Sequence, residues 1–143
     1  MQKFNGIDYF NIESLLTEDE KMVRDSVREF VDAEVIHIIE DHYQQGTFPH
    51  ELVKKLAELG VFGITLPQKY GCAEMNNVAY GLVMQELERG DSGVRSFASV
   101  QSALVMYPIY TFGSDEQKDY WLPKLASGDK IGCFGLTEPD YGS

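Results

Sequence analysis

An arginine in an otherwise apolar segment is the residue whose type and position most clearly indicate chemistry. Arg95 lies near the start of residues 91–110, whose apolar spacing predicts a buried helix. On such a helix Ser99 and Ser102 share its face at i+4 and i+7, and Ser96 is its neighbour. A buried guanidinium requires an anion, its planar fork matches a carboxylate, and hydroxyls can complete the shell. One interpretation is therefore a site for a substrate carboxylate.

A purely structural role for Arg95 fits the same spacing. Glu88 and Asp91 precede it by one or two helical turns, so either carboxylate could form an intrahelical salt bridge with it. The net charge of −11 argues against binding to nucleic acid or to an anionic membrane. An anionic small-molecule substrate would therefore need a local positive group. The spacing alone leaves both interpretations of Arg95 open.

The closing segment is the second place where the residue types indicate chemistry. Residues 131–136 are apolar and read as a strand, but Gly132 and Gly135 interrupt the run, which is typical of close approach by a ligand or another backbone. Thr137 adds a hydroxyl, and residues 139–142 read as a turn. Bare backbone and a hydroxyl would suit a flat polar ring, although an ordinary strand and turn would look the same.

A strand without partners is not stable. We therefore expect its sheet to lie in residues outside this sequence, so that the chain is the front part of a longer protein. We place a helical domain at residues 1–128 and the start of a β-domain at residues 129–143.

The cysteines and histidines do not show the spacing of a metal site. Cys72 and Cys133 are far apart and form no CxxC pair, which suits reduced thiols in a reducing compartment. His37, His42 and His50 do not cluster with them, so we expect surface or helix-end histidines and no metal.

Apolar periodicity predicts an all-α bundle of about five amphipathic helices that positions these residues. The first predicted helix is residues 18–43, with an interruption near His37 and an end of the segment at Gly46. The second runs from Pro49 to Gly60 and the third from Asn76 to Gly90. The fourth runs from Asp91 to about Tyr107, where Pro108 kinks or ends it, and a short fifth helix after Ser114 is divided by Pro123. In segment 91–110 the residues predicted to face the core are Val94, Phe97, Ala98, Leu104 and Val105. Residues 61–72 read as a buried connection, and no dinucleotide or phosphate-loop motif is present.

The composition is that of a globular protein without a targeting segment. Hydrophobic residues make up 43% of the chain, and no apolar run approaches the roughly 20 residues of a membrane span. The first 30 residues are rich in carboxylates and lack an apolar signal core. We expect a bacterial cytoplasmic protein, or a mitochondrial matrix protein whose transit peptide is absent from this sequence.

The closing residues also carry a resemblance to a known family. "FGLTEPDYGS", residues 134–143, resembles the flavin-binding signature of the acyl-CoA dehydrogenases. The whole chain is similar to that family's N-terminal helical domain plus the first strand of its middle β-domain. Within the family, residues 81–139, and "ERGDSGVRSFASVQ" above all, are most similar to the glutaryl-CoA dehydrogenases.

The resemblance implies roles for individual residues. The Thr137 hydroxyl would contact the flavin ring, and Ser143 would contact both the cofactor and the thioester arm of CoA. Arg95 and Ser96 would hold the free carboxylate of the glutaryl group, with Glu88 near the acyl pocket and orienting Arg95. The implied cofactor-binding residues are Phe134, Gly135, Leu136, Thr137, Gly142 and Ser143. Tyr141 departs from the small residue that members often have in this turn.

The resemblance also implies an activity. A member would oxidise an acyl-CoA thioester with FAD as hydride acceptor, and the glutaryl enzyme would then decarboxylate its product to crotonyl-CoA. The catalytic base would lie in a C-terminal domain, so we name no catalytic residue here and expect residues 1–143 alone to be inactive. The electron acceptor would be an electron-transfer flavoprotein, and the assembly a homotetramer. Alternatives are a general short-chain acyl-CoA dehydrogenase and a non-catalytic helical interaction module.

Overall fold

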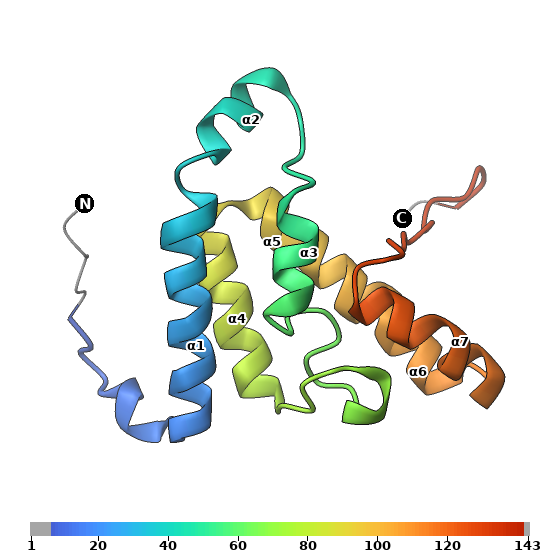
Figure 1. Ribbon diagram of the computed structural model, residues 1–143, viewed down its shortest axis with the longest axis horizontal. Coiled ribbons are helices and arrows are strands. Elements are labelled where there is room, and N and C mark those ends of the chain that lie inside the picture. The colour runs from blue at the N-terminus through green and yellow to red at the C-terminus, as the bar shows by residue number, and fades with distance from the viewer. Residues whose placement is uncertain (1–6, 142–143) are drawn as a thin grey trace.

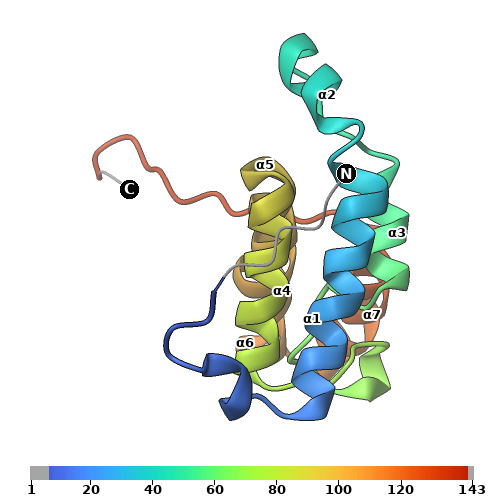
Figure 2. The ribbon, with the colours of Figure 1, turned by 90° about the vertical axis from the view of Figure 1, so that its left-hand side faces the viewer.

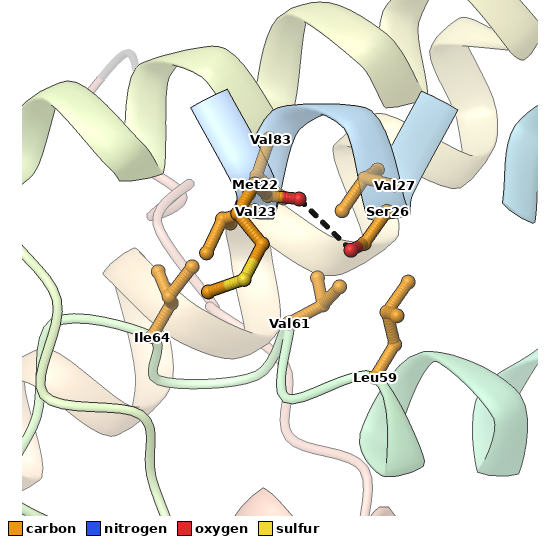
Figure 3. Close-up of a pocket in the computed structure, with 8 residues that line it drawn as sticks. All are labelled: Met22, Val23, Ser26, Val27, Leu59, Val61, Ile64 and Val83. Carbon is orange, nitrogen blue, oxygen red and sulfur yellow. Dashed lines mark hydrogen bonds between the residues drawn. The ribbon is translucent and has the colours of Figure 1, made fainter. Parts of the chain in front are cut away.

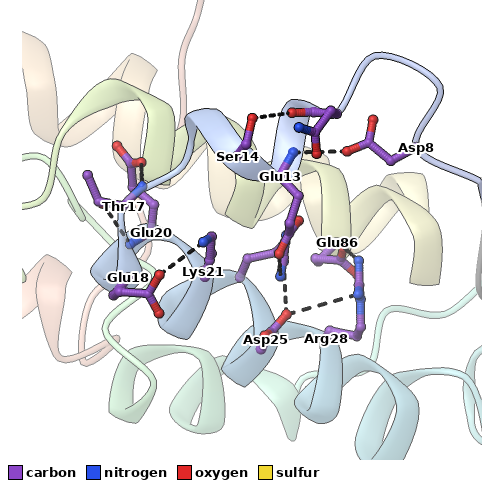
Figure 4. Close-up of polar contacts among 12 residues, drawn as sticks. Asp8, Glu13, Ser14, Thr17, Glu18, Glu20, Lys21, Asp25, Arg28 and Glu86 are labelled. Atoms are coloured by element: carbon purple, nitrogen blue, oxygen red, sulfur yellow. Dashed lines mark hydrogen bonds and ion pairs between the residues drawn. The ribbon is translucent and has the colours of Figure 1, made fainter.

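Helix α1, Glu18–Phe30, begins at a capping box formed by Thr17 and Glu20. The Thr17 hydroxyl accepts a hydrogen bond from the Glu20 amide, and the Glu20 carboxylate accepts one from the Thr17 amide (Figure 4). The second Glu20 oxygen accepts a hydrogen bond from Asn76 Nδ2 at 2.7 Å. Because Asn76 itself caps α4, Asn77–Gly90, this contact ties the starts of the two helices together.

The computed structural model describes residues 7–141, which form a bundle of α-helices (Figure 1). The remaining helices are α2 Ile39–Gln45, α3 Leu52–Glu58, α5 Ser92–Ser99, α6 Tyr107–Phe112 and α7 Asp115–Ala126. Short 3-10 turns span Ile12–Leu15 and Gln68–Tyr70, and π-helical turns span Val31–Val35 and Val100–Met106. Helices α1 and α4 run side by side, as do α6 and α7, whereas α2 projects from one end. None of the helices within residues 7–141 is long and apolar enough to cross a membrane.

The hydrophobic core lies where α1, α3, α4 and α5 meet. The connection at residues 61–72 is buried, as predicted, and supplies Phe62 and Leu66 to this core. The fully buried apolar residues of the helices and the π turns include Val27, Val31, Val35, Leu52, Leu56, Val83, Leu87, Val94, Ala98, Met106 and Leu122. Burial of this surface, rather than helix propensity, holds such short helices in place.

Several predicted helix boundaries are confirmed and others are wrong. The chain turns at residues 36–38, which confirms the interruption near His37, and Gly46 ends α2 in the left-handed conformation. The second helix begins at Leu52 rather than Pro49. Pro123 does not divide α7, because its ring lies on the exposed side of that helix, where water can reach the carbonyl it leaves unpaired.

The predicted helix from Asp91 to about Tyr107 is present and is capped by Asp91, but it is not a regular α-helix throughout. The π turn at Val100–Met106 adds residues per turn and shifts the helical phase, so Leu104 is 43% exposed instead of buried. Pro108 does not end the helix. It lies in the first turn of α6, directly after the π turn, and α6 continues to Phe112.

The predicted closing strand does not form within the described residues. After α7 the chain leaves the helices (Figure 2), and residues 131–137 have no regular secondary structure. A turn is present at residues 138–141, where the Tyr141 amide donates to the Glu138 carbonyl and the two residues form an isolated bridge. Gly142, the last residue of the predicted turn, lies outside the described residues. A strand requires a neighbouring strand, and residues 7–141 provide none at this position.

Candidate functional site

The link between α4 and α5 sets the position of Arg95. Helix α4 ends at Gly90, and Asp91 alone connects it to α5, whose first turn it caps by accepting a hydrogen bond from the Val94 amide at 2.8 Å. This short link brings the last turn of α4 next to the first turn of α5. Arg95 Nε donates to Glu88 Oε2 at 2.6 Å across it. Of the two predicted ion-pair partners, Glu88 is therefore the one found, and Asp91 serves as the cap.

The Glu88 carboxylate is held on both oxygens. Ser92 Oγ donates to Oε1 at 2.6 Å while Arg95 occupies Oε2. The Ser92 hydrogen bond, followed by that of Arg95, lowers the pKa of Glu88 below its ordinary value. Sequence reasoning missed Ser92, although its i, i+4 spacing from Glu88 was a usable signal.

The guanidinium of Arg95 retains donors for a further anion. Its side chain is 34% exposed, and its contact with Glu88 is made through Nε. Within residues 7–141 the hydrogen bond of the guanidinium is the one from Nε, and none engages its terminal nitrogens. Two parallel N–H donors of this kind match a carboxylate bidentately. The ion pair with Glu88 and the capture of a second carboxylate are therefore compatible.

The serines predicted to surround Arg95 divide into two groups. Ser96 is half-buried beside Arg95, and its carbonyl accepts a hydrogen bond from the Ser99 hydroxyl at 3.1 Å. Ser102 is buried in the core, where it accepts from the Gly63 amide at 3.1 Å. Because the π turn changes the helical phase after Ser99, the prediction that Ser102 completes the shell around Arg95 is wrong.

The predicted flavin segment lies open on the surface. Phe134 and Leu136 are 50% and 55% exposed, and Thr137 is exposed. A Cβ placed on Gly135 would meet nothing within 4 Å. A flat ring such as isoalloxazine fits these groups. The backbone and the Thr137 hydroxyl offer hydrogen-bond donors, and the exposed Phe134 and Leu136 offer apolar surface. Gly142 and Ser143 lie outside the described residues.

A pocket of about 180 Å³ between α1, α4 and the connection after α3 does not serve as this site (Figure 3). Its lining residues are Met22, Val23, Ser26, Val27, Leu59, Val61, Ile64 and Val83. The Ser26 hydroxyl in this lining donates to the Met22 carbonyl at 2.8 Å, so it is already bonded within its own helix. The pocket contains none of the predicted site residues, and no set of polar groups converges in it.

The cysteines and histidines have separate surroundings. Cys72 is buried, which raises the pKa of its thiol to about 11, whereas Cys133 is exposed. His42 contacts Thr47 Oγ1 at 2.8 Å and Glu51 Oε1 at 3.3 Å near the end of α2. Across the part of the chain that the structure describes, no group of His, Cys, Asp and Glu is arranged to hold a metal ion.

Comparison with known proteins gives consistent matches. Residues 17–129 match the acyl-CoA dehydrogenase N-terminal domain. The mitochondrial short-chain specific acyl-CoA dehydrogenase of Bos taurus is 38% identical over 128 residues, and the probable acyl-CoA dehydrogenase YngJ of Bacillus subtilis is 40% identical over 130 residues. These matches cover 90% of this chain but 31% and 34% of the two proteins. The chain therefore spans about a third of the length of the curated relatives it matches.

A solved structure gives a similar result. The glutaryl-CoA dehydrogenase of Mycobacterium smegmatis in complex with FADH2 superposes with a TM-score of 0.89 and 53% sequence identity, over 94% of this chain and 34% of that one. The helical bundle, the matched residues and the signature at the end of the sequence agree. This chain belongs to the acyl-CoA dehydrogenase family and carries its N-terminal domain.

Proposed function

We propose that this chain is the front portion of an FAD-dependent acyl-CoA dehydrogenase that acts on glutaryl-CoA. The observation that carries the proposal is the arrangement of Arg95, whose Nε is held by Glu88 while its terminal nitrogens are available. A substrate with a free carboxylate would use those donors. The 53% identity to the glutaryl-CoA dehydrogenase of Mycobacterium smegmatis supports the same substrate.

The residues around Arg95 have distinct tasks in this proposal. Arg95 binds the free carboxylate of the glutaryl group, and the neighbouring Ser96 hydroxyl adds a donor. Glu88, fixed by Ser92, orients the guanidinium through Nε and compensates its charge when the site is empty. The chain thus offers an anion site in spite of a net charge of −11.

The open segment after α7 is proposed to hold the cofactor. Phe134, Gly135, Leu136 and Thr137 would contact FAD, together with Gly142 and Ser143, and Ser143 would also contact the thioester arm of CoA. FAD, when bound, would supply the two-electron acceptor for the β-hydride of the acyl group. The chain's own contribution is to seat the ring against bare backbone and to offer the Thr137 hydroxyl.

The overall reaction would be α,β-dehydrogenation followed by decarboxylation to crotonyl-CoA. We assign no catalytic base within residues 1–143 and expect it in a C-terminal domain, so this chain alone should not turn over substrate. An electron-transfer flavoprotein would take the electrons, and the assembly would be a homotetramer. The compartment would be the bacterial cytoplasm or the mitochondrial matrix.

A second candidate is a short-chain acyl-CoA dehydrogenase without a carboxylate requirement. The 38% identity to the bovine short-chain enzyme favours it. In that case Arg95 would have only its structural pairing with Glu88. The two candidates differ in how much catalysis depends on Arg95.

The test compares two substrates in the protein purified from its complete reading frame. With an artificial electron acceptor, Arg95→Met should lower kcat/KM for glutaryl-CoA by about 100-fold, as expected for loss of a bidentate charge-assisted contact of about 3 kcal/mol. The value for butyryl-CoA should change less than about threefold, since that substrate has no second carboxylate. The control is Arg24→Ala, which removes an arginine of α1 whose ion-pair partner is Glu13. Equal losses on both substrates would overturn the carboxylate role, and absence of bound FAD would overturn the dehydrogenase assignment.

A further inference from the structure

We propose that Gln101 is a positioning residue for the segment that holds the cofactor. Its side chain is 1% exposed and lies in the π turn at Val100–Met106. Buried amides of this kind are kept only where their donors and acceptors are satisfied. Both Nε2 donors and the Oε1 acceptor of Gln101 are engaged with one region, the exit of the chain from α7. The inference rests on the proposed function, because the importance of that exit comes from the flavin segment directly after it.

Three hydrogen bonds connect Gln101 to the exit. Its Nε2 donates to the Leu125 carbonyl in the last turn of α7 at 3.0 Å and to the Lys130 carbonyl at 2.9 Å. Its Oε1 accepts from the Gly132 amide at 2.9 Å. One side chain therefore fixes the end of α7 and the chain on both sides of Ile131. Phe134, the first predicted flavin contact, follows Gly132 by two residues.

The lack of a side chain at Gly132 lets its backbone pack closely against the π turn. A Cβ on Gly132 would lie 2.4 Å from Val105 Cγ1, far inside the van der Waals limit. Val105 belongs to the same π turn as Gln101. The backbone at Gly132 is thus hydrogen-bonded by one residue of the π turn and packed directly against another. No ordinary side chain would allow both contacts.

Both polar groups lie on the buried face of this helical segment. Leu104 was predicted to be buried but is 43% exposed, whereas Gln101 and Ser102 are buried because they follow Ala98 at i+3 and i+4. The two polar side chains are aimed at different segments. Gln101 holds the exit from α7, and Ser102 holds the connection at Gly63 by accepting its amide hydrogen. Ser102 is therefore a matched control on the same turn.

Amide hydrogen exchange, followed by NMR on the 143-residue chain, tests the assignment in a crossed design. Gln101→Met keeps the side-chain length and should speed exchange at Gly132 by at least about tenfold, the factor for one lost hydrogen bond, while Gly63 changes less than about threefold. Ser102→Ala should give the reverse. Equal effects of the two variants on both amides would show general loosening and would overturn the proposal.

The unsubstituted chain supplies a measurement that needs no variant to fold. The Gly132 amide should exchange at least about tenfold more slowly than the Gly135 amide, which has no hydrogen-bond partner within the described residues. Similar protection at the two glycines would contradict the clamp directly.

Binding of FAD by the protein from its complete reading frame separates this inference from the proposed function. Gln101→Met should weaken FAD binding by at least about tenfold, and Ser102→Ala by less than about threefold. Unchanged FAD affinity in Gln101→Met would overturn the positioning role while the dehydrogenase assignment stands. Failure of the unsubstituted protein to bind FAD would remove the proposed function, and with it the cofactor role of Gln101, even where the exchange result confirms the clamp.

Discussion

Replacing Glu86 with glutamine should destabilise the helical bundle more than any other single loss of charge on α4. Glu86 is 1% exposed although it is ionisable. It accepts hydrogen bonds from Arg28 Nη2 at 2.7 Å, Arg28 Nε at 3.2 Å and Arg89 Nε at 3.0 Å (Figure 4 shows the Arg28 side). The two Arg28 contacts join α1 to α4 across 58 residues of sequence, and the Arg89 contact lies within α4. Glutamine keeps the size of the side chain but removes the charge that both arginines share.

The magnitude follows from the burial of the partners. Breaking a buried ion pair costs about 3–5 kcal/mol, and a hydrogen bond to a charged group contributes about 1.5–3 kcal/mol. The side chains of Arg28 and Arg89 are 42% and 40% exposed, so water replaces part of what they lose. Arg89 also keeps Asp32, at 2.8 Å. We therefore expect a loss below that of a fully buried pair, about 2–3 kcal/mol in the free energy of unfolding.

Urea unfolding of the 143-residue chain measures this loss. With a slope of about 2 kcal/mol/M, the midpoint should fall by about 1 M or more while the slope stays constant. Glu88→Gln is the matched control, because Glu88 is 46% exposed on the same helix and its loss should cost under about 1 kcal/mol. A Glu86→Gln loss no larger than that of the control would refute the reasoning. A double-mutant cycle with Arg28→Met should show coupling above about 0.5 kcal/mol.

Three other predictions concern packing, thiol chemistry and pH. Gly90→Ala should cost about 1–3 kcal/mol in urea unfolding, because its Cβ would lie 2.8 Å from a valine methyl of the first π turn; a neutral result would contradict the close packing. At pH 8 a thiol reagent should modify Cys133 rapidly and Cys72 only on unfolding, since Cys72 is buried and burial raises its pKa to about 11. Rapid modification of both thiols in the folded chain would disprove this. The hydrogen bond from Asn76, followed by that from the Thr17 amide, lowers the pKa of Glu20 in the folded chain. The ionised carboxylate therefore stabilises the fold at pH values above its unfolded pKa of about 4.3. This stabilisation is lost as the pH falls through the lower pKa of the folded chain. Glu20→Gln should therefore destabilise the chain at pH 7 and flatten the acid side of its stability profile, and an unchanged profile would count against the linkage.

The site could be predicted in its parts but not in its arrangement. The spacing of Glu88 and Arg95 allowed their pairing, yet Asp91 was an equally good partner until the one-residue link between α4 and α5 made it the cap. Ser92 was overlooked because a serine at i+4 from a glutamate is common and usually without consequence. The strand at residues 131–136 was predicted from local composition, but strand formation depends on a neighbour that local composition does not report.

Local sequence determined the features whose causes are local. The capping boxes at Thr17 and Ser114 and the cap at Asn76 all follow from residue types within a few positions of one another. The resemblance to the acyl-CoA dehydrogenases likewise came from contiguous residues, above all those at 134–143.

The tertiary structure decided what depends on partners distant in sequence. Glu86 can be buried because Arg28 from α1 pairs with it, in addition to Arg89 of its own helix, and the contribution of Arg28 could not be read from α4 alone. Gln101 and Ser102 can be buried because two other segments present backbone groups that hydrogen-bond with those side chains. Helical periodicity counts residues along one helix, whereas burial and hydrogen bonding are set by what lies opposite, and only the folded chain brings those groups together.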